Sequence, residues 1–384
     1  MKLILHIGTV KTGTTTAQAW LGENRDVLNA NGIWYPTSFS AVDRRPEGIS
    51  HSFLVDPVLA PEYFRQNALG AFTAEFENRQ KAGCNVCVMS FEDMHFKLSS
   101  REMVAQLAEF LKDYFDDVRI ALYLRPQIDT VISFASTASK LGVKINKRWF
   151  YGQSRNRLVF DYNAAVDRWE SVFGRENVRC FSYKRDLPFA DYIFEQFSID
   201  RAALKVIGNQ NTSVGSNIIA LGNALQIPFL FSDSVVQNLP RSEPIFVGME
   251  IARMFQGQFE DSNAELTSRR DDIRMGDLEP DWGRYEKPEN LASIEQACIY
   301  SAELRGLVRL LAGQLSLERA QNALMRSEIA RERRQWNAMI ALAKLAMNEA
   351  AAAMQVEAFR AEAQRIRDLA AVLVASQPSD APSA

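Results

Sequence analysis

The sequence feature that most constrains the fold is an apolar run near the N-terminus that leads directly into a segment rich in glycine and threonine. Leu3–Ile7 is nearly continuous apolar sequence, as in a central parallel strand covered by helices on both faces. Gly8–Thr16 follows, and from Thr14 apolar residues recur on one face of a predicted helix that stops at Asn31–Gly32. Strand, loop and helix in this order bring free backbone N–H groups and a helix dipole to the loop, which favours an anion-binding site.

Apolar runs and amphipathic stretches alternate along the next part of the chain. We expect further strands and intervening helices, the strands at Val86–Ser90, Ile120–Leu124 and Val178–Tyr183 and the helices at Met103–Tyr114 and Ile128–Leu141. This alternation predicts an α/β fold over residues 1–285, with a P-loop-like parallel sheet flanked by helices.

After about Trp282 the composition shifts to Ala, Glu, Arg, Leu and Met, which predicts a C-terminal α-helical extension over 286–376 and a disordered tail over 377–384. Apolar residues repeat there at spacings typical of a coiled-coil-like seam: Leu304, Val308, Leu311, Leu315, Met325, Ile329, Trp336, Ile340, Ala343, Met347, Ala350 and Met354. Because Glu318, Asn322 and Glu332 interrupt the seam, we expect helices that fold back on each other or on a partner, including a homo-oligomer, rather than one regular rod.

Composition argues against several classes of protein. Lys+Arg 44 against Asp+Glu 47 leaves a formal net charge of -3, which argues against a nucleic-acid-binding chain. No stretch reaches the roughly 18 apolar residues of a membrane span, and the N-terminal run is too short for a secretory signal, so we expect no transmembrane segment and a cytoplasmic location. Four scattered cysteines should be free thiols, and the Cys84–Cys87 spacing lacks the second pair or nearby His set of a metal site.

The Gly8–Thr16 loop differs from a nucleotide-kinase loop in one informative way. Gly8 and Gly13 have the five-residue separation of a Walker A motif, but Lys11 precedes Gly13 and a threonine follows it. The string Lys-Thr-Gly-Thr-Thr resembles the 5′-phosphosulfate-binding loop of sulfotransferases that use 3′-phosphoadenosine 5′-phosphosulfate (PAPS). The resemblance implies a sulfotransferase-like fold in which this loop binds the donor through Lys11, Thr12, Gly13, Thr14, Thr15 and Thr16. The alternative is a capped helix start without a ligand.

A second pair of residues matches the same family. Arg125 ends a predicted strand and Ser133 lies eight residues later, as in the arginine and serine that hold the donor's 3′-phosphate in sulfotransferases. Phe181-Ser182-Tyr183 resembles the family strand whose tyrosine lies near the adenine, although Lys184-Arg185 replaces the usual acidic pair. No Arg-Lys-Gly loop completes the 3′-phosphate site, so Asn211–Ser213 or Arg269–Arg270 are the candidates for that role.

Sulfuryl transfer also needs a proton acceptor and a cation near the leaving oxygen. Lys11 suits the cation. Glu92, in a Phe-Glu setting after a predicted strand, is the first candidate for the base, because glycan-modifying family members place a glutamate similarly; His95 is the second, after the histidine of small-molecule members. His51 is a further alternative, and His6, inside the first strand, is interpreted as a hydrogen-bonded core residue.

The acceptor is predicted only by class. The glutamate and the absence of a Golgi-type membrane anchor suggest a bacterial-type cytoplasmic enzyme that sulfates a saccharide or glycolipid without a metal. Flat rings can stack on sugar faces, and an aromatic cluster follows the predicted 3′-phosphate helix, although such a cluster is more often core; it comprises Trp149, Phe150, Tyr151, Phe160 and Tyr162. Two other classes stay open. One is a P-loop kinase using ATP and Mg²⁺ with Asp93 as metal ligand, and the other is a non-catalytic sulfotransferase-fold protein that assembles through its C-terminal helices.

Overall fold

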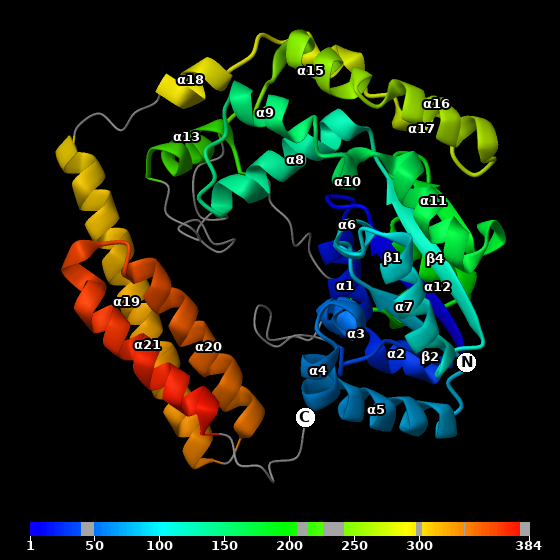
Figure 1. The fold of residues 1–384 in the computed structure, drawn as a ribbon, viewed down its shortest axis with the longest axis horizontal. Helices are drawn as coiled ribbons and strands as arrows, with labels where there is room; N and C mark the ends of the chain where they lie inside the picture. The colour runs from blue at the N-terminus through cyan, green and yellow to red at the C-terminus, as the bar shows by residue number, and fades with distance from the viewer. Residues whose placement is uncertain (40–49, 206–213, 226–241, 297–301, 334, 377–384) are drawn as a thin grey trace.

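The computed structural model describes residues 1–39, 50–205, 214–225, 242–296, 302–333 and 335–376 (Figure 1). Within these ranges five strands form one parallel sheet in the order β2-β3-β1-β4-β5. The strands are β1 Lys2–Gly8, β2 Ile33–Trp34, β3 Val86–Ser90, β4 Asp117–Leu124 and β5 Val178–Ser182. The predicted α/β parallel sheet is therefore confirmed, and β2, with two residues, is the strand that the sequence did not indicate.

Alternate residues of the central strand β1 enter two different cores. Leu3 and Leu5 pack on one face of the sheet, against α7 (Arg101–Lys112) and α11 (Tyr162–Phe173). Ile4 packs on the opposite face with α1 (Thr14–Glu23), α2 (Arg25–Ala30) and α12 (Phe189–Gln196). Because both faces are covered, β1 lacks a polar face, which explains its nearly continuous apolar sequence.

Six further helices lie between β2 and β5 along the described part of the chain. They are α3 Asp56–Leu59, α4 Pro61–Phe64, α5 Gly70–Lys81, α6 Met94–Lys97, α9 Lys147–Gln153 and α10 Arg157–Phe160.

A further apolar core is built around α8 (Gln127–Lys140), which follows β4. It includes residues of α13 (Ser216–Leu225), α15 (Gly248–Gly257) and α18 (Leu291–Gln296). Figure 1 shows α8 and α9 beneath the arc formed by α13, α18 and α15. Two more helices, α16 (Glu260–Arg269) and α17 (Met275–Leu278), lead back toward the end of β5.

The C-terminal part contains three helices, α19 (Ala302–Glu332), α20 (Trp336–Ala353) and α21 (Arg360–Ala375), that fold back on one another (Figure 1). Their shared core is built mainly of alanine, with Ala320, Ala323, Ala343, Ala346, Ala350, Ala353, Ala363 and Ala370 all buried. Small side chains let helix axes approach closely, so the prediction of helices that fold back is confirmed.

In α19 the predicted seam does not face the bundle. Its apolar members Leu311, Leu315, Met325 and Ile329 are exposed, while the face of the helix that packs within the bundle carries Ala320, Ala323 and other residues offset from them. Alanine packing replaces leucine packing in this bundle, and alanine gives a weak periodic signal. Within the described residues, no helix is both long and apolar enough to cross a bilayer.

Candidate functional site

The candidate site lies where the parallel strands end, and its centre is the loop between β1 and α1. Gly8 and Gly13 have φ of +101° and +81°, and Lys11 has φ of +67°, so three residues of the loop are in the left-handed region. Gly13 occupies the position before α1 without a side-chain cap on the helix. This conformation turns the chain sharply and points the N–H groups of the first helical turn at the loop, as in anion-binding sites.

Gly8 allows the loop to pass directly beside Glu92. A Cβ atom added at Gly8 would lie 2.6 Å from the backbone oxygen of Glu92 and 3.1 Å from its Cβ. Glu92 follows β3, which pairs with β1, so the topology brings the predicted base next to the predicted donor loop. Any side chain at position 8 would push these two segments apart.

The Glu92 carboxylate is held by a buried glutamine of α1. Gln18 Nε2 lies 3.1 Å from Glu92 Oε2, and it also lies 3.2 Å from both the carbonyl oxygen and Oγ of Ser90. Gln18 is 1% exposed. Ser90 Oγ in turn lies 2.8 Å from His6 Nδ1, so a chain of hydrogen-bonding groups runs from the centre of the sheet to Glu92.

Lys11 and Arg125 meet on the other side of the loop. Lys11 Nζ donates to Thr137 Oγ1 of α8 at 3.0 Å, and Arg125 Nη1 donates to the carbonyl oxygen of Lys11 at 3.2 Å. Ser133 lies one helical turn before Thr137, and residues four apart share a helix face. Ser133 is therefore on the face of α8 that carries the Lys11 contact.

Tyr183 closes the cluster from the end of β5. The Arg125 guanidinium stacks over its ring at 5.0 Å, and a Cβ atom added at Gly13 would lie 3.9 Å from its Cε2. The Tyr183 N–H donates to the carbonyl oxygen of Leu124 at 2.8 Å, which fixes its backbone beside β4. The structure thus brings Lys11, Gly13, Glu92, Arg125 and Tyr183 to one edge of the sheet.

The threonines of the loop have different surroundings. Thr12 Oγ1 donates to the carbonyl oxygen of Thr9 at 2.6 Å and stabilises the turn. Thr14 Oγ1 is buried and has no hydrogen-bond partner among the described residues. Thr15 and Thr16 are half-buried in the first turn of α1. A buried hydroxyl without a partner at an uncapped helix start suits an anionic ligand, because such a ligand would accept from it.

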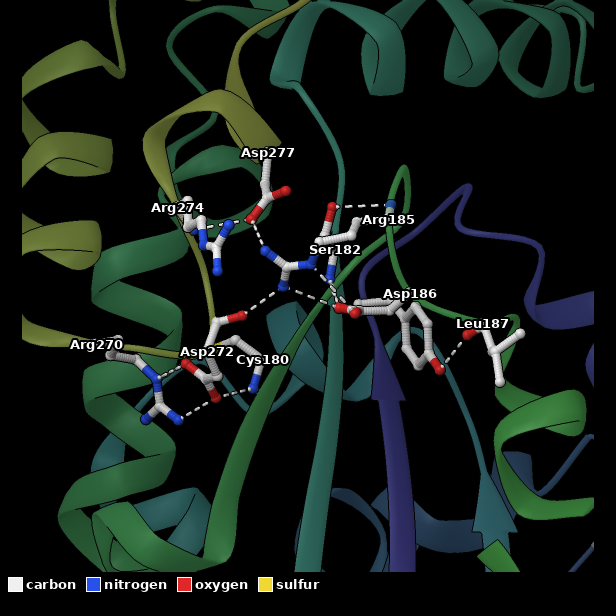
Figure 2. Close-up of polar contacts among 10 residues, drawn as sticks. Cys180, Ser182, Arg185, Asp186, Leu187, Arg270, Asp272, Arg274 and Asp277 are labelled. Atoms are coloured by element: carbon white, nitrogen blue, oxygen red, sulfur yellow. Dashed lines mark hydrogen bonds and ion pairs between the residues drawn. The ribbon is translucent and has the colours of Figure 1, made fainter. Parts of the chain in front are cut away.

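A network of charged side chains holds the turn that carries Tyr183, and Figure 2 shows the part of it formed by Ser182, Arg185, Asp186, Asp272 and Asp277. The Ser182 N–H donates to Asp186 Oδ2 at 2.6 Å, and Arg185 pairs with Asp277 at 2.6 Å and donates to the carbonyl oxygen of Asp272 at 2.8 Å. Lys184 Nζ donates to the carbonyl oxygen of Glu279. Arg185 and Lys184 therefore anchor a segment that begins before α17, at Asp272, and ends just after it, at Glu279.

Arg269 and Arg270 do not complete a phosphate site. Both guanidinium groups pair with the Glu170 carboxylate, and Arg270 also pairs with Asp272 at 2.5 Å. Arg270 Nη2 donates to the carbonyl oxygen of Val178, and Asp272 Oδ2 accepts from the Cys180 N–H at 2.8 Å (Figure 2). The alternative candidate, Asn211–Ser213, lies outside the described residues.

All three histidines of the chain are buried. Ser90 N–H donates to His51 Nδ1 at 2.8 Å, so His51 carries its proton on Nε2 and donates it to Pro36 O at 3.0 Å. Burial lowers the pKa of His51 to about 4 and that of His6 to about 3. The hydrogen bond and stacking of His6, on Phe189, confirm its interpretation as a core residue.

His95 is also committed to the protein interior. Its Nδ1 lies 2.8 Å from the carbonyl oxygen of Glu92 and its Nε2 lies 3.4 Å from that of Val159. Burial lowers the pKa of His95 as well. The His95 imidazole is fully buried and both of its nitrogens face backbone carbonyl oxygens. This placement does not favour His95 in the role of the base.

Most of the predicted aromatic acceptor surface is core. Phe150, Phe160 and Tyr162 are fully buried, and only Trp149 and Tyr151 are partly exposed.

Cys84, Cys87 and Cys180 are buried free thiols, while the fourth cysteine, at 298, lies outside the described residues. Among the residues that the structure describes, no three His, Cys, Asp or Glu side chains are grouped to hold a metal ion.

The sequence did not indicate Gln18 or Thr137. Both are polar residues on helices, and neither follows a strand end. Gln18 could have been found from its position between Ala17 and Leu21, on the apolar face of α1. An amide buried on such a face requires hydrogen-bond partners, which would have indicated a polar site nearby.

Comparison with known proteins gives little further information. No family model and no curated protein matches the chain. The fold is similar to a sulfotransferase from Alicyclobacillus acidocaldarius, with a TM-score of 0.32 and 15% sequence identity over 58% of this chain and 92% of that one. A similarity this weak carries no functional argument.

Proposed function

We propose that this protein is a sulfotransferase that moves the sulfuryl group of PAPS to a hydroxyl or amine of a saccharide or glycolipid acceptor. The observation that carries the proposal is the convergence of four strand ends. Lys11 follows β1, Glu92 follows β3, Arg125 follows β4 and Tyr183 follows β5, and contacts join their segments at one edge of the sheet.

The donor would occupy the loop and the groups around it. The N–H groups of the first turn of α1 and the buried Thr14 hydroxyl suit the 5′-phosphosulfate. Arg125 and Ser133 would hold the 3′-phosphate, and the exposed ring of Tyr183 would stack on the adenine. These assignments follow the family resemblance, and the contacts of Arg125 with Tyr183 and with the loop support them.

In the proposed reaction, Glu92 takes the proton of the acceptor hydroxyl as its oxygen attacks sulfur. The new S–O bond forms opposite the bond that breaks, and the leaving 5′-phosphate oxygen keeps the electron pair. Lys11 would stabilise that developing negative charge. Gln18 is a positioning residue, because its amide holds one oxygen of the Glu92 carboxylate.

The test is a thermal-shift titration with 3′-phosphoadenosine 5′-phosphate beside AMP and Mg·ATP. At about 100 times Kd a ligand that binds only the native state adds about 2.7 kcal/mol, which raises the midpoint by several degrees. A shift with the 3′-phosphorylated nucleotide alone supports the donor site. A larger shift with Mg·ATP favours the kinase instead, and no shift with any nucleotide favours the non-catalytic protein.

A further inference from the structure

The face of α19 that points away from its own bundle carries a regular stripe of exposed residues. Successive members are separated by four and three residues, as at the a and d positions of a coiled coil. We call this the α19 stripe: Leu311, Leu315, Glu318, Asn322, Met325 and Ile329, all exposed.

The stripe is distinct from the surface that α19 already uses. Ala320, Ala323, Leu324 and Ser327 are buried against the other helices of the bundle, and none of them belongs to the stripe. Leu311 is 57% exposed and Met325 is 59% exposed, so two large apolar side chains are more than half open to water. Over its length of about 27 Å, the stripe is a helix face, apolar toward both ends, that the described part of the chain leaves exposed.

The order of residues in the stripe is self-complementary when reversed. Two apolar residues are followed by Glu318 and Asn322, and then by two apolar residues again. A second copy of α19 running in the opposite direction therefore places Leu315 against Met325 of the other copy and Leu311 against its Ile329. In the middle, the Asn322 amide of each copy lies opposite the Glu318 carboxylate of the other and can donate to it.

Charge also selects the antiparallel arrangement. In a parallel pair each core residue meets its own equivalent, so Glu318 of the two copies would be buried against one another. That arrangement places like charges together in the seam, although Gln314 Nε2 of the same helix donates to Glu318 Oε1 at 3.2 Å. Arg319, which lies near the two-fold axis, interacts electrostatically with Glu349 of its own bundle, which reduces repulsion between the copies.

We propose that the protein forms an antiparallel homodimer through the α19 stripe, held by four apolar pairs around two Asn322–Glu318 hydrogen bonds. The interface is short, at the lower end of the range for specific complexes, so we expect dissociation at micromolar concentrations. This proposal is independent of the chemistry at the sheet edge, because no residue of the stripe belongs to that site.

The first test is the mass of the full chain in solution, measured by sedimentation over about 1 to 100 µM, a range that brackets such an interface. We expect conversion from 43.3 kDa to twice that mass. Leu315→Glu should raise the dimer Kd by about 100-fold, because it places a charge in two core layers. The matched control is Leu345→Glu on α20, since both leucines are 41% exposed in one copy.

Circular dichroism checks that each variant is folded. A monomer at every concentration overturns the proposal, and so does a dimer that Leu315→Glu leaves intact or that Leu345→Glu weakens equally.

The second test determines the direction of the helices by disulfide cross-linking in a Cys298→Ser background, in which the remaining described cysteines are buried. Mixing the Leu311→Cys and Ile329→Cys variants should yield a cross-link between the two chains, whereas each variant alone should stay uncross-linked. In the antiparallel pair, equivalent Leu311 residues lie about 27 Å apart, far beyond disulfide reach. Cross-linking of either variant with itself would show a parallel dimer and overturn the proposal.

Discussion

Replacement of Gly8 by alanine tests the closest contact in the candidate site. The new Cβ would meet the Glu92 backbone oxygen at 2.6 Å, and φ of +101° is unfavourable for any L side chain. The conformational cost is about 1–2 kcal/mol, and forcing the loop away from Glu92 adds about 1–3 kcal/mol, as for overpacked cores.

Gly83 provides the matched control, because its φ is +87° and an added Cβ meets nothing within 4 Å. Gly83→Ala should therefore show the conformational cost alone. With about 3 °C for each kcal/mol in a domain of this size class, the thermal midpoint should fall by roughly 3–6 °C for Gly83→Ala and by roughly 6–15 °C for Gly8→Ala. Differential scanning calorimetry measures both. Equal losses would refute the close passage of the loop beside Glu92.

Three further predictions concern chemistry, donor binding and pH. Glu92→Gln should keep donor affinity and lower turnover by about 10²-fold or more; unchanged turnover in a sulfate-transfer assay would remove Glu92 from the role of base. Arg125→Ala should weaken binding of 3′-phosphoadenosine 5′-phosphate by about 1.5–3 kcal/mol in calorimetry, whereas Arg179→Ala, which removes a guanidinium stacked on Phe181, should leave it unchanged. His6 is neutral when folded, with a pKa of about 3, against 6.5 unfolded, so its stabilisation is complete above pH 6.5 and is lost as pH falls toward 3. Urea unfolding measures how much the free energy of unfolding falls between pH 6.5 and pH 5, and His6→Phe should make this fall smaller by roughly 2 kcal/mol. The same dependence of the unfolding free energy on pH in variant and wild type would contradict this prediction.

The sheet could be predicted because its longer strands are buried on both faces. Val86–Ser90 was predicted with the bounds that the structure gives, since this run of apolar and small residues begins after Asn85 and lies just before Glu92 and Asp93. Ile33–Trp34 was missed because two residues are too short to show any periodicity. In α19 the leucines did not indicate the face that packs within the bundle, because that face uses alanine, whose small side chain lets the helices approach closely.

The proximity of the candidate-site residues to one another could also be predicted in part. Residues after parallel strands meet at one edge, so Glu92 and Arg125 lie near the loop even though they are far apart in sequence. Their chemical roles remain predictions. The pairing of Arg269 and Arg270 with Glu170 joins residues about a hundred positions apart, and local sequence holds no sign of it. Gln18 was missed for a similar reason, because its partners come from β3.

The side chains around β5 have a consequence for the sheet as a whole. β5 is the last strand, and it pairs with β4 alone, so its outer backbone groups would ordinarily be open to another strand. Here Arg270 donates to Val178 O, and Asp272 and Asp186 accept from the N–H groups of Cys180 and Ser182. At every second residue of β5 a charged side chain therefore binds one backbone group. Addition of another strand beside β5 would have to displace these ion-paired groups, so this side of the sheet is protected from edge-to-edge aggregation.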